Sequence, residues 1–282
     1  MVVLRGGLVR ADLLITSVQN PKLKDAIRLR ERRDREETKL FLIEGYREIS
    51  RALQSGIVFE ALFFSPAHFL GSNESTLIEQ AAKRGCKLYE CAEQVFPKLS
   101  YRDRPDGLVA VAKQMQYALT DLEHVFTKTK TPLFIVAEAI EKPGNLGTIL
   151  RSADAVKADG VIVCDRCTDI YNPNVVRAST GTLFTLPVIE AGGKETLTWL
   201  LNHQIAVVAA TPSASIEFTE ANLNGAIAII VGTEQLGLSA LWIKAATIQV
   251  RIPMLGVADS LNVATATTLL LYEARRQRRG VQ

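Results

Sequence analysis

The chain has 282 residues, of which 48% are hydrophobic and 22% charged, a composition that indicates a folded globular protein and excludes a disordered one. No apolar run approaches the roughly 20 residues needed to span a bilayer, and the N-terminal stretch is interrupted by Arg5, Arg10 and Asp12. We therefore expect neither a transmembrane helix nor a signal peptide. The net charge of +3 has an N-terminal origin, because residues 1–115 hold 19 Lys and Arg against 15 Asp and Glu, whereas the remainder holds 14 against 15.

The first part of the chain predicts a small α/β domain over residues 16–114, preceded by a leader at 1–15. Residues 20–35 predict one amphipathic, highly charged helix. Its stretch 22–35 holds seven basic and three acidic residues, which suits a polyanion or a solvated face with ion pairs, and on charge alone we favour the solvated face. Strands and helices then alternate, as in an α/β sandwich. Strands are predicted at 41–45, 59–65, 86–91 and 107–114, and helices at 46–56 and 75–85.

A polar run at 115–130 is the expected linker to a second, larger α/β domain at 131–282. The apolar strands of this domain are continuous rather than alternating, which is typical of a parallel sheet covered on both faces. In such sheets ligands bind at the carboxyl ends of the strands. Strands are predicted at 133–140, 160–164, 205–211, 226–232 and 248–254, helices at 145–160, 196–204, 238–246 and 261–277, and a helix followed by a strand at 175–190.

The four cysteines form two close pairs, Cys86 with Cys91 and Cys164 with Cys167, a spacing that raises the possibility of a zinc or redox site. No histidine lies near either pair, and Cys164 ends an apolar run. We favour buried, unpaired thiols over a zinc site, and expect no metal. Unpaired thiols fit a reducing cytoplasm.

Three polar clusters follow apolar segments of the second domain. The first begins a helix, where Asn145 lies at the entrance and Arg151 follows two turns later, on what we expect to be the same helix face; free backbone N–H groups at the helix start can bind an anion. The second is the loop GTEQLG, which presents Glu234 after a strand. The third is IPMLGVADSLNVA, in which Ser260 and Asn262 begin a helix. Taken alone, the first cluster is better explained by an N-cap and a surface arginine, the second by an ordinary loop, and Ser260 of the third by helix capping.

Two common nucleotide-binding patterns are missing, because the sequence holds neither GxGxxG nor GxxxxGK[ST]. This argues against a nicotinamide-dependent enzyme.

Taken in order, the three clusters resemble the SpoU (TrmH) branch of the SPOUT RNA methyltransferases. The resemblance lies in N-x-G-x-x-x-R from Asn145 to Arg151, in G-x-E-x-x-G-L from Gly232 to Leu238, and in I-P-M-x-G-x-x-x-S-L-N-V-A from Ile252 to Ala264. The segment ASTGTLFTLPV is also similar to the family, as are FLIEG and DRPDGLVAV of the first domain. The resemblance implies a mainly parallel α/β domain with a deep trefoil knot, preceded by a substrate-binding domain like ribosomal protein L30e.

The resemblance also implies transfer of a methyl group from S-adenosylmethionine to a ribose 2′-hydroxyl of RNA. The implied reaction centre contains Asn145, Arg151, Glu234, Ser260 and Asn262. The implied cofactor contacts are Thr211, Gly232, Ile252, Pro253, Met254, Leu261 and Val263. Arg151 suits a bidentate hold on the phosphate beside the target ribose. It is a difficult base, because the pKa of arginine lies above about 12.

The basic first domain then becomes a candidate RNA-binding surface, since RNA binding requires phosphate contacts from Lys and Arg. Its candidates are Lys22, Lys24, Arg28, Arg32, Arg47, Arg102 and Arg104, although Arg102 and Arg104 are equally explained as turn caps. The two-domain layout favours 23S rRNA over tRNA. The family implies a homodimer through the C-terminal domain, with the apolar face of residues 264–274 at the interface. A noncatalytic RNA-binding protein that keeps the fold is the alternative.

Overall fold

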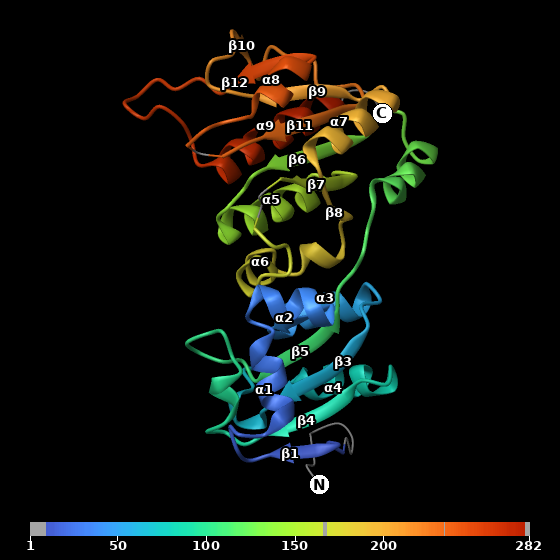
Figure 1. The fold of residues 1–282 in the computed structure, drawn as a ribbon, viewed down its shortest axis with the longest axis vertical. Helices are drawn as coiled ribbons and strands as arrows, with labels where there is room; N and C mark the ends of the chain where they lie inside the picture. The colour runs from blue at the N-terminus through green and yellow to red at the C-terminus, as the bar shows by residue number, and fades with distance from the viewer. Residues whose placement is uncertain (1–9, 166–167, 234, 280–282) are drawn as a thin grey trace. The chain divides into compact units, whose positions relative to one another are not determined.

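The computed structural model describes residues 10–165, 168–233 and 235–279, which divide into two compact units. Unit 1 contains the described residues up to Met115 together with Asp169–Thr185. Unit 2 contains Gln116–Thr168 and Leu186–Gln282, as far as they are described. Each unit is built on its own sheet (Figure 1). The predicted α/β class, with a separate N-terminal domain and a parallel second sheet, is confirmed.

Unit 1 has a five-stranded mixed sheet in the order β1-β4-β3-β5-β2. Its strands are β1 (Leu13–Ile15), β2 (Leu40–Glu44), β3 (Phe59–Phe64), β4 (Lys87–Cys91) and β5 (Leu108–Lys113). β5 runs antiparallel to both β2 and β3, whereas β1, β3 and β4 are parallel. The helices are α1 (Pro21–Arg28), α2 (Arg32–Thr38), α3 (Tyr46–Gln54) and α4 (Glu74–Lys83), with 3₁₀ turns η1 (Pro66–His68) and η2 (Phe96–Lys98).

The single helix predicted at residues 20–35 is wrong, because the chain forms two helices there. α1 ends at Arg28, and the extended backbone of Glu31 (φ −85°, ψ 137°) separates it from α2. The break leaves the carbonyl groups of Leu29 and Arg30 free, and Nη1 of Arg35 donates hydrogen bonds to them at 2.8 and 2.7 Å. Arg35 is thereby drawn inward and is only 1% exposed.

Unit 1 also takes in a segment from the second half of the chain, with helix α6 (Pro173–Ala178) and 3₁₀ turn η4 (Thr182–Phe184). The Phe41 ring lies 4.6 Å from that of Tyr171 and 6.1 Å from that of Phe184, between ring centroids. Arg35 forms an ion pair with Asp169 at 2.6 Å. The domains predicted from the sequence are contiguous, so the prediction does not place residues 169–185 in the first domain.

Unit 2 has a seven-stranded sheet in the order β10-β12-β9-β11-β6-β7-β8, and all its strand pairs in the described part of the chain are parallel. Its central strands are buried along their whole length, as the continuous apolar runs predict. The strands are β6 (Leu133–Glu138), β7 (Gly160–Cys164), β8 (Val188–Ala191), β9 (Ala206–Ala210), β10 (Ile216–Glu217), β11 (Ile227–Val231) and β12 (Ile248–Arg251).

Helices cover both faces of this sheet. On one face pack α7 (Gly193–Asn202), α8 (Ala240–Ala245) and the 3₁₀ segment η3 (Leu119–Thr127). The other face carries α5 (Pro143–Ala155) and α9 (Val263–Arg278), which pack against each other. Because Leu119, Leu122 and Val125 of η3 are buried in this core, much of the stretch expected to be a linker is part of unit 2. Likewise β1, within the expected leader, pairs with β4.

The described chain contains no helix long and apolar enough to cross a membrane. Cys86 and Cys91 are buried and form no disulfide with a described residue. Cys164 is buried and shares a 3.3 Å hydrogen bond with the Thr196 hydroxyl, and Cys167 lies outside the described residues. The trefoil knot and the likeness to ribosomal protein L30e stay predictions.

Candidate functional site

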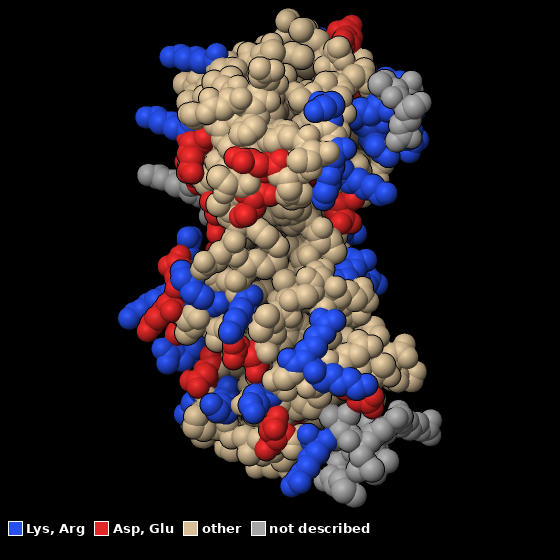
Figure 2. Space-filling model, turned by 90° about the vertical axis from the view of Figure 1, so that its right-hand side faces the viewer, with Lys and Arg blue, Asp and Glu red and all other residues tan. Residues whose placement is uncertain are grey.

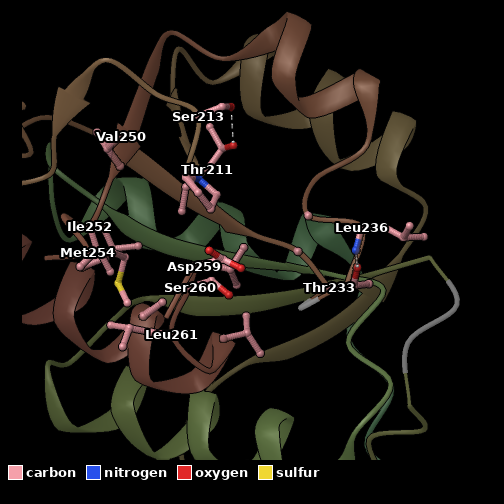
Figure 3. A pocket seen from close by; sticks show the side chains of 18 of the residues that line it. Thr211, Ser213, Thr233, Leu236, Val250, Ile252, Met254, Asp259, Ser260 and Leu261 are labelled. Carbon is pink, nitrogen blue, oxygen red and sulfur yellow. Dashed lines mark hydrogen bonds between the residues drawn. The ribbon is translucent and has the colours of Figure 1, made fainter. Parts of the chain in front are cut away.

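A cavity of about 430 Å³ lies at the carboxyl ends of β9, β11 and β12, where open α/β sheets bind their ligands. Its volume is within the range of small-molecule sites. In Figure 3, Thr211 and Ser213 lie on one side of the cavity, Ile252, Met254 and Leu261 on another, and Thr233 and Leu236 opposite, with Asp259 and Ser260 between them. The remaining lining residues are Ala210, Pro212, Val231, Gly232, Gln235, Gly237, Val250, Val263, Ala266 and Leu270.

The loop after β11 closes on itself so tightly that only glycine fits at its start. A Cβ added to Gly232 would lie 2.3 Å from the Gly237 carbonyl oxygen, closer than real side chains approach. Gly237 itself has φ +65°, which favours glycine. The turn is held by the Gly237 N–H, which donates to the Thr233 carbonyl at 3.0 Å, and by the Leu236 N–H, which donates to Thr233 Oγ1 at 2.9 Å. Glu234 lies outside the described residues.

The loop after β12 returns past the carboxyl ends of β9 and β11 to the start of α9. Asn262 caps α9, because its Oδ1 accepts the N–H groups of Ala264 and Thr265 at 3.0 and 3.4 Å. This fixes the amide orientation, and its Nδ2 donates to Asn145 Oδ1 of α5 at 3.1 Å. The first and third sequence motifs therefore meet at one hydrogen bond.

Arg151 has a different environment from Asn145 on the same helix. Seven residues after Asn145, Ser152 faces α9 and shares a 2.7 Å hydrogen bond with Thr268. Arg151 follows Asn145 by six residues, so it is rotated by roughly a third of a turn away from the face that packs on α9, and it is exposed. No described residue forms a hydrogen bond or ion pair with its guanidinium, and it does not line the cavity. The expectation that both residues share one helix face is wrong.

The cavity suits a mixed polar and apolar ligand that carries positive charge. Aliphatic side chains and Met254 form its apolar walls, and hydroxyl groups supply hydrogen bonds. Asp259 is the only ionisable side chain among its described lining residues. A carboxylate at this position favours a cationic ligand.

The structure brings together six of the seven predicted cofactor contacts. Thr211, Gly232, Ile252, Met254, Leu261 and Val263 line the cavity, whereas Pro253 does not. Ser260 of the predicted reaction centre also lines it. Sequence reasoning missed Asp259, Thr233 and Ser213. Thr233 and Asp259 lie on loops that it had singled out, and Ser213 lies two residues after the predicted contact Thr211.

The predicted RNA-binding residues fall into two groups. Arg28 pairs with Asp34 at 2.8 Å, Arg32 with Glu36 at 2.6 Å, and Arg102 with Asp106 at 2.9 Å. Lys22, Lys24, Arg47 and Arg104 are exposed and form no side-chain hydrogen bond or ion pair with any described residue. Over unit 1, the face in Figure 2 shows basic side chains interspersed with acidic ones. The basic stretch 22–35 is thus partly neutralised within the fold.

Arg102 lies in a part-buried acidic cluster instead of on an open surface. Its guanidinium contacts Asp106 and, at 3.6 Å, Glu48, which is buried. Burial raises the pKa of the Glu48 carboxyl. These contacts favour the turn-holding interpretation of Arg102 over the RNA-binding one.

No group of three or more His, Cys, Asp or Glu side chains with a metal-binding arrangement occurs in the described ranges. The absence of a metal stays a prediction.

Two family models match the chain. The model of the SpoU rRNA Methylase family matches residues 132–272, and that of the MRM3-like substrate binding domain matches residues 20–110. The first agrees with the resemblance seen in the three motifs and the second with the resemblance seen in the first domain, and the suspected family is confirmed.

Individual relatives cover nearly the whole chain. It is 29% identical to the 23S rRNA (guanosine(2553)-2′-O)-methyltransferase RlmP of Bacillus subtilis, over 93% of this chain and 98% of the relative. A crystal structure of an RNA 2′-O ribose methyltransferase is 44% identical with a TM-score of 0.81, over 94% of this chain and 99% of the other. An AdoMet-bound rRNA methyltransferase from Sinorhizobium meliloti is 30% identical with a TM-score of 0.85, over 94% and 98% of the two chains.

Proposed function

Since the chain belongs to the SpoU rRNA methylase family, we propose that it is an RNA (ribose-2′-O-)-methyltransferase that uses S-adenosylmethionine. The observation that carries the proposal is the meeting of the three motifs of unit 2. Two of them line the cavity, and the third is joined to it by the hydrogen bond between Asn262 and Asn145. A noncatalytic RNA-binding protein has no need of this arrangement.

The residues present fit S-adenosylmethionine. Its adenosine is matched by apolar walls with nearby hydroxyl groups, and its sulfonium charge by Asp259. We assign the cofactor contacts to Thr211, Gly232, Ile252, Met254, Leu261 and Val263, with Pro253 shaping the loop. Bound in this cavity, the cofactor supplies a methyl group that is already activated for transfer.

The remaining task of the chain is to position the ribose 2′-hydroxyl and to help remove its proton. Asn145 and Asn262, held together at 3.1 Å, present a fixed amide pair at the start of two helices. Ser260 offers a hydroxyl group inside the cavity. Arg151, whose guanidinium is exposed, holds the phosphate beside the target ribose. The role of Glu234 is proposed from its motif alone.

The RNA substrate is proposed to be 23S rRNA, with tRNA as the alternative. The match of residues 20–110 to a substrate-binding domain and the rRNA specificity in the names of relatives support this choice. Of the predicted RNA-binding cations, Lys22, Lys24, Arg47 and Arg104 have no side-chain partner among the described residues, so they are the proposed phosphate contacts. We place this reaction in the cytoplasm, where unpaired thiols such as Cys86 persist.

The chain is further proposed to form a homodimer through α9, whose exposed Leu269 and Tyr272 form part of the proposed interface. One target ribose must reach both the cofactor cavity and Arg151, yet Arg151 does not line the cavity of its own chain. A second chain is the proposed source of that arginine. If so, mixing inactive Arg151→Ala and Gly232→Ala chains restores about a quarter of the active sites, because half of the dimers are mixed and each mixed dimer has one intact site. A mixture that stays inactive contradicts the shared site, and a monomer by light scattering contradicts the dimer.

Methyl transfer is tested with labelled S-adenosylmethionine and deproteinised 23S rRNA, with tRNA in parallel. We expect label in the ribose of 23S rRNA and a loss of about 100-fold or more for Arg151→Ala. The matched control is Lys194→Ala, which removes an exposed cation from α7 on the other face of the sheet. The absence of label from every RNA refutes the proposal.

Titration with S-adenosylhomocysteine separates the enzyme from a noncatalytic RNA-binding protein. The proposal requires saturable binding that Arg151→Ala leaves intact and Gly232→Ala weakens at least about tenfold. RNA binding with no cofactor binding favours the alternative.

A further inference from the structure

Tyr101 lies on the loop between η2 and β5 of unit 1, and 43% of its surface is exposed. Tyrosine combines an apolar ring with a polar hydroxyl group and is enriched at binding interfaces, so an exposed tyrosine ring held in one orientation is a candidate binding element.

The loop that carries Tyr101 is tied to the body of unit 1 from two sides. Nη2 of Arg30 donates to the carbonyl groups of Lys98, Leu99 and Ser100 at 2.9, 3.0 and 2.8 Å. On the other side, the Tyr101 N–H donates to Glu44 Oε2 at 2.8 Å, and the Ser100 hydroxyl donates to the same carboxylate. Each carboxylate oxygen of Glu44 thus accepts one of these hydrogen bonds.

The side chain of Tyr101 is held in place too, in addition to its backbone. The Arg30 guanidinium carbon lies 5.6 Å from the ring centroid, within the range of a cation–π contact. From α6, Asn174 Nδ2 reaches the Tyr101 hydroxyl at 3.5 Å. An aromatic ring that is ordered in advance loses little entropy when a ligand stacks on it.

An arginine lies beside this ring. Arg177 of α6 and Tyr101 line the same small hollow, together with apolar residues and Glu44. Arg177 is exposed and forms no side-chain hydrogen bond or ion pair with a residue in the described ranges. An aromatic platform beside an unpaired arginine is typical of proteins that hold single-stranded nucleic acid.

We propose that Tyr101 is a stacking platform for one unpaired base of the RNA substrate, and that Arg177 contacts a phosphate of the same strand. The base stacks on the ring face that Arg30 does not cover. The inference rests on the proposed function and deepens it, because it selects an RNA loop or bulge over a duplex, whose bases are already stacked. It also gives α6 a role in substrate binding, although α6 lies outside the matched substrate-binding domain.

The test measures binding of the full chain to deproteinised 23S rRNA, without cofactor, by filter retention over a range of salt concentrations. We expect Tyr101→Ala to weaken binding about tenfold, the effect of one lost base stack, and Tyr101→Phe to bind within about twofold of the wild type. Tyr117→Ala, which removes a comparably exposed tyrosine (44%) from unit 2, should bind as the wild type does.

Salt dependence separates stacking from charge. Arg177→Ala should reduce the slope of log K against log salt by about 0.7, the value for one single-strand phosphate contact, whereas Tyr101→Ala should leave the slope unchanged. Ultraviolet cross-linking of the wild-type complex should join RNA to the peptide that contains Tyr101, which requires no variant to fold.

Wild-type affinity in Tyr101→Ala, or equal losses in Tyr101→Phe and Tyr101→Ala, overturns the platform. Because the assay contains no cofactor, its outcome is independent of methyl transfer. If Tyr101→Ala weakens RNA binding but the wild type transfers no methyl group, only the proposed enzyme activity is refuted. If the wild type transfers the methyl group but Tyr101→Ala binds RNA normally, only the stacking platform is refuted.

Discussion

Arg35 of unit 1 and Arg151 of unit 2 show how differently the two units use the same side chain. Arg35 is 1% exposed, and its guanidinium is bonded to Asp169 and to two backbone carbonyl groups. Arg151 is exposed and has no side-chain partner among the described residues. A fully bonded arginine stabilises a fold, whereas an unpaired one is available to a phosphate. The partners of an arginine, more than the number of cations nearby, therefore distinguish an RNA contact from a structural one.

The largest effect on stability is expected from Arg35→Ala. It leaves the carboxylate of Asp169 part-buried without its cation, which costs about 3–5 kcal/mol of unfolding free energy. Arg151→Ala should change that free energy by less than about 0.5 kcal/mol, since it removes an exposed side chain. Urea unfolding followed by circular dichroism measures both. Equal stabilities of the two variants would contradict a structural role for Arg35 that Arg151 lacks.

Gly232→Ala tests the cavity edge of unit 2. The added Cβ meets the Gly237 carbonyl at 2.3 Å, so the loop must open, and we expect at least about tenfold weaker binding of S-adenosylhomocysteine by calorimetry. The control is Gly192→Ala, where a Cβ meets nothing within 4 Å and the backbone is extended. Unchanged affinity in Gly232→Ala would place the ligand elsewhere.

Two matched helix caps sharpen the comparison between the units. Asn20 caps α1 in unit 1 and Asn262 caps α9 in unit 2, so replacement of either by Ala should cost about 1 kcal/mol of unfolding free energy. Only Asn262 also holds Asn145, so only Asn262→Ala should reduce methyl transfer, by about tenfold or more.

Asn262→Asp separates the two roles of that side chain. It keeps the capping oxygen and removes the Nδ2 donor, so we expect stability near that of the wild type and activity near that of Asn262→Ala. Full activity in Asn262→Asp would show that the hydrogen bond to Asn145 is dispensable.

The smallest effect concerns the thiols of unit 1. Burial raises the pKa of Cys86 and Cys91 to about 12, against about 8.5 in an unfolded chain. The unfolded state therefore loses these protons first, and the stability contributed by the buried thiols is complete below about pH 8.5 and is lost as pH rises toward 12. Mass spectrometry after alkylation at pH 8 should find both thiols unmodified in the native protein and modified in denaturant. Rapid native labelling would contradict their burial.

Much of unit 2 was predictable because its signals are local. Continuous apolar runs gave β6, β7 and β11, which are buried on both sides, and the glycine pattern around Gly232 marks a turn that other residues cannot form. Asp259 was not predicted, although its neighbour Ser260 on the same loop was.

The rest depends on contacts that sequence spacing does not contain. The packing of residues 169–185 into unit 1 rests on Arg35 with Asp169 and on Phe41 with Tyr171, pairs more than 100 residues apart. The three-residue strand β1 is too short to show a pattern, and two of its three residues are exposed. The count of basic residues could not indicate which of them acidic neighbours neutralise.

Transfer of a methyl group by this chain to a ribose of 23S rRNA is best tested in cells. Ribose 2′-O-methylation is mapped across all rRNA and tRNA from cells with the protein, from cells without it, and from cells that carry Arg151→Ala. We predict that one 23S rRNA nucleotide loses its methyl group without the protein, and that the wild type but not Arg151→Ala restores it. Identical methylation maps in all three would contradict the claim, and a site lost only from tRNA would select the alternative substrate.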